Sequence, residues 1–277
     1  MAAQDQPDQT ALVDTHCHLD FNSFDADREQ VVRRAGEAGI LRIVNPGIDL
    51  QSSRAALALA GDYPAVYTAV GVHPNSAATW ETDSLQALRE LAGMEKVVAI
   101  GEIGLDYYRQ HASRDVQRRV LLSQLDLAAE CGLPVILHCR EAFADLLAIL
   151  AEWHATLAAA GSALIERPGV LHSFSGDEAE AAAALELGFM IGLTGPVTFS
   201  KAVSLQRLAR SLPLEKLLVE TDAPFLAPHP QRGRRNEPAY VRLIAGKIAQ
   251  LREQPLEAVA QATSANAARL FNWSDLD

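Results

Sequence analysis

The strongest constraint on the fold is the alternation of eight short apolar segments with amphipathic segments along the whole chain. The apolar segments are rich in Val, Ile and Leu, which is typical of strands buried on both faces of a parallel sheet. They cover residues 12–15, 41–46, 66–72, 97–103, 134–138, 170–172, 189–193 and 217–221. Because parallel strands need a long crossover connection, we expect a helix between each strand and the next.

The segments between the strands have helical periodicity. Residues 27–38 and 116–129 place apolar side chains three and four positions apart, as on one face of a helix. Gly39 and Gly132 follow these segments, where a left-handed residue commonly ends a helix. A last helix is expected at residues 256–270. Together these units predict an α/β fold, a TIM-like (β/α)8 barrel with a C-terminal helix, in a single domain.

A doubly wound open sheet is the alternative fold. It would need a glycine-rich turn after the first strand, but that turn contains His16, Cys17 and His18. We therefore expect one barrel domain over residues 12–277. The polar residues 1–11 are expected to form a flexible N-terminal tail.

Charge and cysteine content limit the possible partners and the compartment. The formal net charge of −11 argues against a protein that coats nucleic acid through a broad basic face. Three cysteines without an export signal favour a reducing compartment, so we expect a cytoplasmic protein. No apolar run is long enough to span a membrane, and we expect a monomer without membrane contact.

Histidines and carboxylates gather at the expected carboxyl ends of the strands, where barrels of this kind carry their active sites. His16 and His18 are two positions apart on a strand, so both side chains point to one face. The full set of candidate metal ligands is His16, His18, Glu102, His138, His172 and Asp222. Six ligands exceed the needs of one tetrahedral ion and predict two divalent ions.

Each ion has an expected set of ligands. His16, His18, Glu102 and Asp222 would hold one ion. His138 and His172 would hold the other, with Glu102 bridging both. Imidazole and carboxylate groups accept several metals, so the ligands leave the choice among Zn, Mn and Mg open.

Three residues are candidates for contacts with the substrate. His73 precedes a proline, so it either contacts a substrate oxygen or caps the following turn. Arg232 and Asn236 belong to an arginine-rich loop after the last strand, and this loop leads into a helix. Arginines and helix N-termini favour phosphate. A solvated basic loop is the alternative.

Six stretches of the chain together resemble the TatD family of metal-dependent deoxyribonucleases, within the amidohydrolase-like barrels. They are residues 14–20, 71–74, 101–107, 172–176, 220–224 and 232–238. The resemblance implies a TIM-like barrel, a binuclear metal site and hydrolysis of DNA phosphodiesters, often as a 3′→5′ exonuclease. It implies the same six metal ligands and supports His73, Arg232 and Asn236 as residues on the substrate side.

The chain departs from the family pattern in two places. The segment between His138 and His172 is longer than usual, with an alanine-rich helix expected at residues 147–161. The family often has lysine directly after the Thr-Phe that ends strand seven. Here Ser200 takes that position and Lys201 follows it.

These observations predict a deoxyribonuclease that acts on DNA ends or single strands through a metal-activated hydroxide. Asp222 would act as the general base, Glu102 as the shared catalytic carboxylate, and Arg232 would stabilise charge on the phosphoryl oxygens. A hydrolase of a small phosphoester, a lactone or an aminoacyl-tRNA ester is the alternative enzyme, because barrel loops vary substrate readily. A binding protein without catalysis is the third hypothesis.

Overall fold

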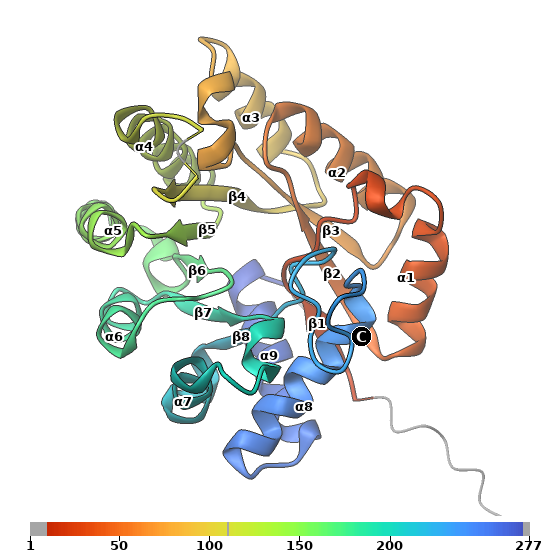
Figure 1. Ribbon diagram of the computed structural model, residues 1–277. Coiled ribbons are helices and arrows are strands. Elements are labelled where there is room, and N and C mark those ends of the chain that lie inside the picture. Colours follow the sequence, from red (N-terminus) through yellow and green to blue (C-terminus); the bar gives the residue numbers. More distant parts are fainter. Residues whose placement is uncertain (1–9, 110, 274–277) are drawn as a thin grey trace, which may run out of the picture.

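The computed structural model describes residues 10–109 and 111–273. Within these residues, eight parallel strands form one sheet in which each strand pairs with the next along the chain, from β1 to β8 (Figure 1). They are β1 (Leu12–Asp14), β2 (Ile40–Pro46), β3 (Val66–Val70), β4 (Val97–Asp106), β5 (Val135–Arg140), β6 (Gly169–Leu171), β7 (Met190–Leu193) and β8 (Leu217–Val219).

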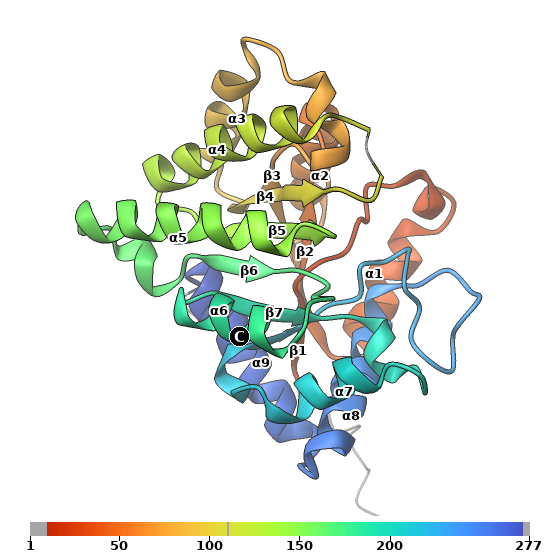
Figure 2. The same cartoon turned by 60° about the vertical axis from the view of Figure 1, so that its left-hand side comes forward.

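Helices connect the strands and surround them on the outside (Figures 1 and 2). They are α1 (Arg28–Glu37), α2 (Leu50–Asp62), α3 (Ser84–Ala92), α4 (Arg114–Cys131), α5 (Phe143–Ala159), α6 (Glu178–Glu186), α7 (Val203–Ser211), α8 (Val241–Arg252) and α9 (Leu256–Phe271). In the part of the chain that the structure describes, no helix has the length and apolar character needed to cross a membrane.

The sheet closes into a barrel through the segments that follow β1 and β8. The backbone N–H of Asp222 donates to the carbonyl of His16, and the N–H of His18 donates to the carbonyl of Ala223, both at 2.8 Å. Cys17 and Ala223 form a parallel bridge between the same segments. The predicted (β/α)8 barrel with a C-terminal helix is therefore confirmed. Closure also places His16 and His18 beside Asp222, which lies about two hundred residues away in the sequence.

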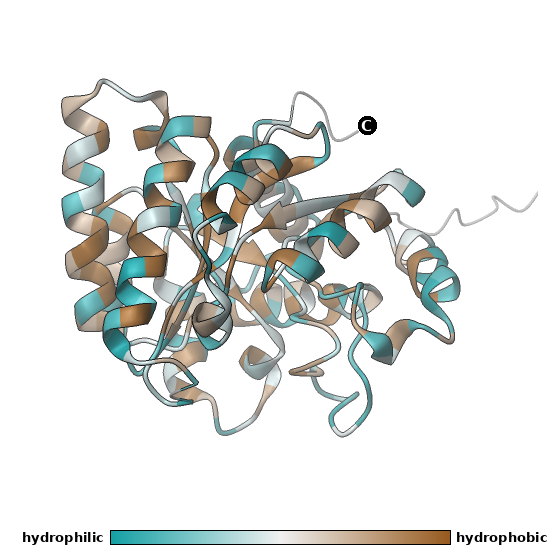
Figure 3. Cartoon of the chain, turned by 90° about the horizontal axis from the view of Figure 1, so that it is seen from above, coloured by the Kyte–Doolittle hydropathy of each residue, from teal (hydrophilic) through white to brown (hydrophobic). Residues whose placement is uncertain are grey.

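The interior of the barrel wall is apolar, as the strand composition predicts. The ten residues of β4 are all buried, and Figure 3 shows brown apolar strands enclosed by helices of mixed hydropathy. β4 and β5 run further than expected, with pairing up to Asp106 and Arg140. Gly104 permits this approach, because a Cβ atom there would lie 1.9 Å from the carbonyl oxygen of His138.

The expected N-terminal tail falls mostly outside the described residues, which start at Thr10. Thr10 is buried, and the carbonyl of Ala11 accepts a hydrogen bond of 3.1 Å from the Ser264 hydroxyl in α9. The flexibility expected of residues 1–9 and the domain boundary stay predictions.

The arginine-rich loop between β8 and α8 is tied to α1. Arg235 forms two hydrogen bonds of 2.6 and 2.8 Å with the two carboxylate oxygens of Asp27. Arg34 of α1 binds Glu237 in the same two-point manner, at 3.0 and 2.6 Å. Arg235 is thus engaged by a carboxylate, and the loop is held against the barrel rim.

We expect Asp27→Asn to lower the free energy of unfolding at pH 7 by about 1 kcal/mol, the upper range for a partly exposed pair. The hydrogen bond from Arg235 lowers the pKa of Asp27 to about 2. A carboxyl group with a depressed pKa contributes stability above its unfolded pKa and loses it as pH falls through the folded value. Urea unfolding at pH 7 and at pH 2 measures this: the difference between wild type and variant should shrink at pH 2. An equal difference at both pH values would contradict it.

Candidate metal centre

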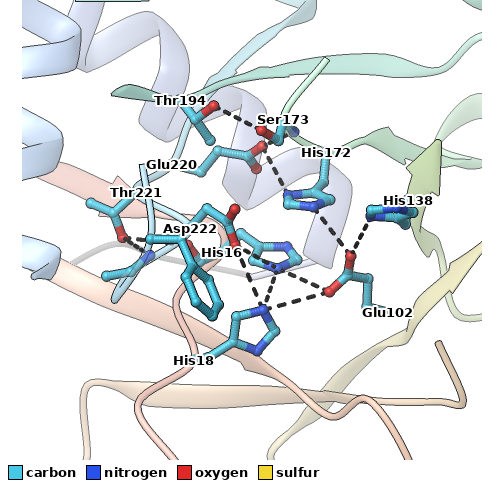
Figure 4. A network of polar contacts seen from close by, with 12 residues as sticks. His16, His18, Glu102, His138, His172, Ser173, Thr194, Glu220, Thr221 and Asp222 are labelled. Atoms are coloured by element: carbon cyan, nitrogen blue, oxygen red, sulfur yellow. Dashed lines mark hydrogen bonds and ion pairs between the residues drawn. The ribbon is translucent and has the colours of Figure 1, made fainter. Parts of the chain in front are cut away.

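Four side chains from three places in the sequence converge, from the segments that follow β1 and β8 and from within β4 (Figure 4). The Nε2 atoms of His16 and His18 lie 3.2 Å apart. Glu102 Oε2 lies 3.4 Å from the first of these nitrogens and 3.5 Å from the second. Asp222 Oδ1 lies 3.9 and 3.7 Å from the same two atoms.

The second carboxylate oxygen of Glu102 faces a different set of imidazoles. Oε1 lies 3.1 Å from His138 Nδ1, 3.2 Å from His172 Nε2 and 3.4 Å from His73 Nε2. The Glu102 carboxylate is buried and stands between the two groups (Figure 4). One carboxylate is therefore shared by two clusters of nitrogen donors.

The spacing of these atoms fits divalent ions. A zinc ion bound to imidazole at about 2.0–2.1 Å places tetrahedral ligands about 3.4 Å apart. The separations among His16, His18, Glu102 and Asp222 scatter around this value, from 3.2 to 3.9 Å. The ligand atoms of His73, Glu102 and His138 also lie within 4.8 Å of one another. The sets His16–His18–Glu102 and His73–Glu102–His138 can each hold an ion.

Electrostatics favour ligand forms of these groups. Burial and the nearby His16 lower the pKa of His18 to about 3, so at neutral pH its ring is uncharged and offers a lone pair. Burial alone would raise the pKa of Glu102, but His172, His73 and His16 outweigh it and hold that pKa well below its usual range. Burial raises the pKa of Asp222. The two carboxylates of one site thus have opposite shifts.

Two further carboxylates, to which the sequence analysis assigned no role, orient the histidines. Asp106 Oδ2 lies 3.3 Å from His138 Nε2, and Glu220 Oε1 lies 3.4 Å from His172 Nδ1. A carboxylate on the far ring nitrogen fixes the orientation of a ligating histidine and strengthens it as a donor. The sequence could have indicated both carboxylates. Glu220 lies two positions before Asp222, and Asp106 lies four positions after Glu102.

His73 caps the following turn, one of the two roles that the sequence left open, and also faces the metal centre. Its Nδ1 accepts a hydrogen bond of 3.0 Å from the backbone N–H of Asn75, which caps the short 3-10 helix Pro74–Thr79. Its Nε2 faces Glu102 at the centre of the site. His73 therefore lies with the nitrogen donors of the second cluster, closer to the expected metal than its prediction as a substrate contact implied.

The structure places Arg232 and Asn236 away from the cavity above the metal centre. The Arg232 guanidinium is exposed and stacks over the Phe199 ring at 4.2 Å. Asn236 is fully buried, and its amide group donates to the carbonyls of Thr221 and Phe225 at 2.8 and 2.7 Å. Neither side chain lines the cavity above the metal centre. The substrate contacts expected of these two residues stay predictions; in the structure the Asn236 amide is engaged by the backbone of its own loop.

A cavity of about 1030 Å³ opens over the metal centre. Its floor includes His18, Glu102, His138, His172 and Asp222. This volume accommodates more than one nucleotide-sized group.

Three cations and several apolar side chains also line this cavity. The cations are Arg109, Arg140 and Lys201. Among the described residues, none of the three forms an ion pair, although the protein carries an excess of acidic groups. The Arg140 guanidinium lies over the Tyr108 ring at 3.8 Å, which holds it at the rim of the cavity.

A closed eight-stranded barrel with histidines and carboxylates converging at the carboxyl ends of its strands defines a metal-dependent hydrolase. The family model described as TatD related DNase matches residues 13–272. The chain belongs to this family.

Individual relatives agree with this assignment. The chain is 40% identical over 260 residues to the "uncharacterized metal-dependent hydrolase YabD" of Bacillus subtilis, covering 94% of this chain and 98% of the relative. It is 40% identical over 267 residues to the "3′-5′ ssDNA/RNA exonuclease TatD" of Cronobacter sakazakii, covering 94% and 97%. The crystal structure of YJJV, a TatD homologue from Escherichia coli K12, superposes with a TM-score of 0.87 at 34% identity, covering 95% and 99%.

Proposed function

We propose that the protein is a metal-dependent exonuclease that removes nucleotides from the 3′ end of single-stranded DNA or RNA. The observation that carries the proposal is the position of Glu102, whose two oxygens each face a separate histidine cluster at the floor of one cavity. The relative from Cronobacter sakazakii is named a 3′-5′ ssDNA/RNA exonuclease. The family membership and this shared carboxylate support the same chemistry.

The ligands in this proposal are the six residues expected from the sequence, with His73 added to the second cluster. His16, His18, Glu102 and Asp222 would hold one ion, and Glu102, His138 and His172 would hold the other, with His73 beside the second set. Two bound divalent ions, of Zn, Mn or Mg, would supply Lewis acidity and an acidified water for attack on phosphorus. Asp106 and Glu220 hold two of the imidazoles in orientation.

Asp222 is the proposed general base. Its backbone is in the left-handed region, with φ 55°, which few non-glycine residues adopt. This conformation accompanies the turn that aims the carboxylate at His16 and His18. Because burial raises its pKa, the carboxylate is a better proton acceptor than a solvated one.

The phosphates of the strand are proposed to lie along Arg109, Arg140 and Lys201. Guanidinium and ammonium groups without carboxylate partners bind phosphate without first breaking an ion pair. Their local placement reconciles a nucleic-acid substrate with the acidic net charge. Arg232, which the sequence indicated for the same task, does not line the cavity.

The direct test is a metal-reconstituted assay on single-stranded oligonucleotides labelled at the 5′ end. We expect a ladder that shortens one nucleotide at a time from the 3′ end, with no activity after treatment with a chelator and recovery on adding Mn²⁺ or Zn²⁺. Turnover of small phosphoesters, lactones or aminoacyl esters without any oligonucleotide product would overturn the proposal. The cytoplasmic location and the monomeric state stay predictions.

We expect Arg140→Gln to raise KM for a single-stranded oligonucleotide about tenfold, as loss of one charge-assisted hydrogen bond would. The slope of log affinity against log salt concentration should become shallower by about 0.7, the contribution of one phosphate contact on a single strand. Titrations of the chelated protein with labelled oligonucleotide at several salt concentrations measure this slope. Arg33→Gln, in an exposed pair with Glu37 on α1, is the matched control. An unchanged slope for Arg140→Gln would exclude a phosphate contact.

A further inference from the structure

An aromatic ring stands half exposed at the wall of the cavity, close to the metal centre. Phe225 lines the cavity, is 51% exposed and follows Asp222 by three residues. Burial of an apolar ring is favourable, and the fold leaves Phe225 half uncovered. We propose that Phe225 is the platform on which a nucleobase adjoining the scissile phosphate stacks. This inference rests on the proposed nuclease function.

The ring belongs to a continuous series that starts at a metal-ligand candidate. The ring of Phe21 stacks on His18, with centroids 4.7 Å apart and an interplanar angle of 20°. Phe225 meets Phe21 edge-on at 5.9 Å and 78°, the arrangement that aromatic pairs favour. The series places Phe225 one ring beyond the ligand shell, so a base on it would lie beside the reacting phosphate.

The backbone holds this platform in place. The N–H of Phe225 donates to the carbonyl of Asp222 at 2.8 Å, and its carbonyl accepts from the Asn236 amide at 2.7 Å. Asn236 also holds the carbonyl of Thr221. Asn236 thus acts as a positioning residue for the segment that carries both Asp222 and Phe225.

The surroundings of Phe225 match a nucleotide better than a small polar substrate. Leu226 and Val203 are also exposed apolar residues that line the cavity. The same cavity carries the unpaired cations Arg109 and Arg140. A wall with both an apolar face and free cations complements a flat base joined to charged phosphates. A base held in a duplex is already stacked and paired, so this platform favours a single strand.

The test compares oligonucleotides that carry a normal or an abasic nucleotide on either side of the scissile bond. In the wild-type holoenzyme, loss of the stacked base should lower kcat/KM by roughly 5- to 150-fold, the range for one base–aromatic stack. For the normal substrate, kcat/KM of Phe225→Ala should be as low as that of wild type on the abasic substrate. For Phe225→Ala, removal of the base should then cause little further loss. Phe225→Trp should restore discrimination. The effect should fall mainly on KM.

Controls separate this inference from the proposed function and from misfolding. Hydrolysis of the normal oligonucleotide by wild type tests the proposed function alone. Phe225→Leu keeps apolar volume without a flat ring and should behave like Phe225→Ala, with an unchanged melting temperature. Leu122→Ala, at an exposed site on α4 outside the cavity, should discriminate as wild type does. If Phe225→Ala or Phe225→Leu still distinguishes base from abasic site as wild type does, at both positions, the stacking role is refuted while the nuclease assignment stands.

Discussion

Asp222→Asn is expected to lower kcat on single-stranded DNA by about 10³- to 10⁴-fold while leaving the fold intact. General-base catalysis contributes about 10²- to 10⁴-fold, and the same change weakens a ligand of the first ion. Asn236 and the backbone hydrogen bonds that join Asp222 to His16 and Ala223 to His18 keep the segment in place. Single-turnover rates with saturating Mn²⁺ measure the loss.

The stability of this variant is expected to move in the opposite direction from its activity. Burial raises the pKa of Asp222, with Glu102 and Glu220 adding to the rise. In metal-free protein at pH 7 this buried carboxylate therefore opposes folding, and an uncharged amide relieves it. We expect a metal-free melting temperature equal to or above that of wild type. Asp126→Asn, at an exposed position on α4, is the control. Wild-type turnover by Asp222→Asn would refute the role of general base.

Glu102→Gln is expected to remove activity by more than about 10³-fold and to destabilise the metal-free protein. The carboxylate faces histidines through both of its oxygens, so its loss removes the bridge between the two clusters and should lower the bound metal below two ions. Burial alone would raise its pKa, but the neighbouring His172, His73 and His16 hold it well below the usual value. Its stabilising contribution is therefore complete above pH 4.5 and would be lost as pH falls through the folded pKa.

Thermal unfolding in chelator at pH 7 and elemental analysis of the loaded protein measure these effects. Breaking a buried ion pair costs about 3–5 kcal/mol, so a clear fall in melting temperature is expected for Glu102→Gln, against no fall for Asp222→Asn. Neutralising a carboxylate should therefore lower the melting temperature at Glu102 and leave it equal or raise it at Asp222. Equal responses, or full metal content in Glu102→Gln, would contradict the bridging role.

The sequence predicted the metal-ligand candidates best, because they lie next to strands that the apolar pattern reveals. Strand periodicity placed His16 and His18 on one face, and the rule that barrel sites lie at the carboxyl ends of strands gathered Glu102, His138 and Asp222. The structure brings these residues together as expected. It extends β4 and β5 to Asp106 and Arg140, because Gly104 allows a backbone approach that apolar patterning does not register.

The residues proposed for substrate contact were least predictable. The arginine-rich loop that leads into a helix made Arg232 and Asn236 phosphate candidates. In the fold, Arg235 is paired with Asp27, 208 positions away in the chain. Asn236 is buried and donates to backbone carbonyls, while the cations that line the cavity come from the end of β5 and from other loops.

By itself, the sequence determined the barrel, the order of its strands and the chemical identity of the metal-ligand candidates. These features depend on the short-range periodicity of apolar residues and on the barrel topology, which places the site at the carboxyl ends of the strands. Only the tertiary structure decided which oxygen of Glu102 faces which imidazole, that His73 joins them, and that Phe225 stands open to the cavity. The reason is physical: such contacts form between groups from distant segments, and the paths of the loops set their distances after the barrel has closed.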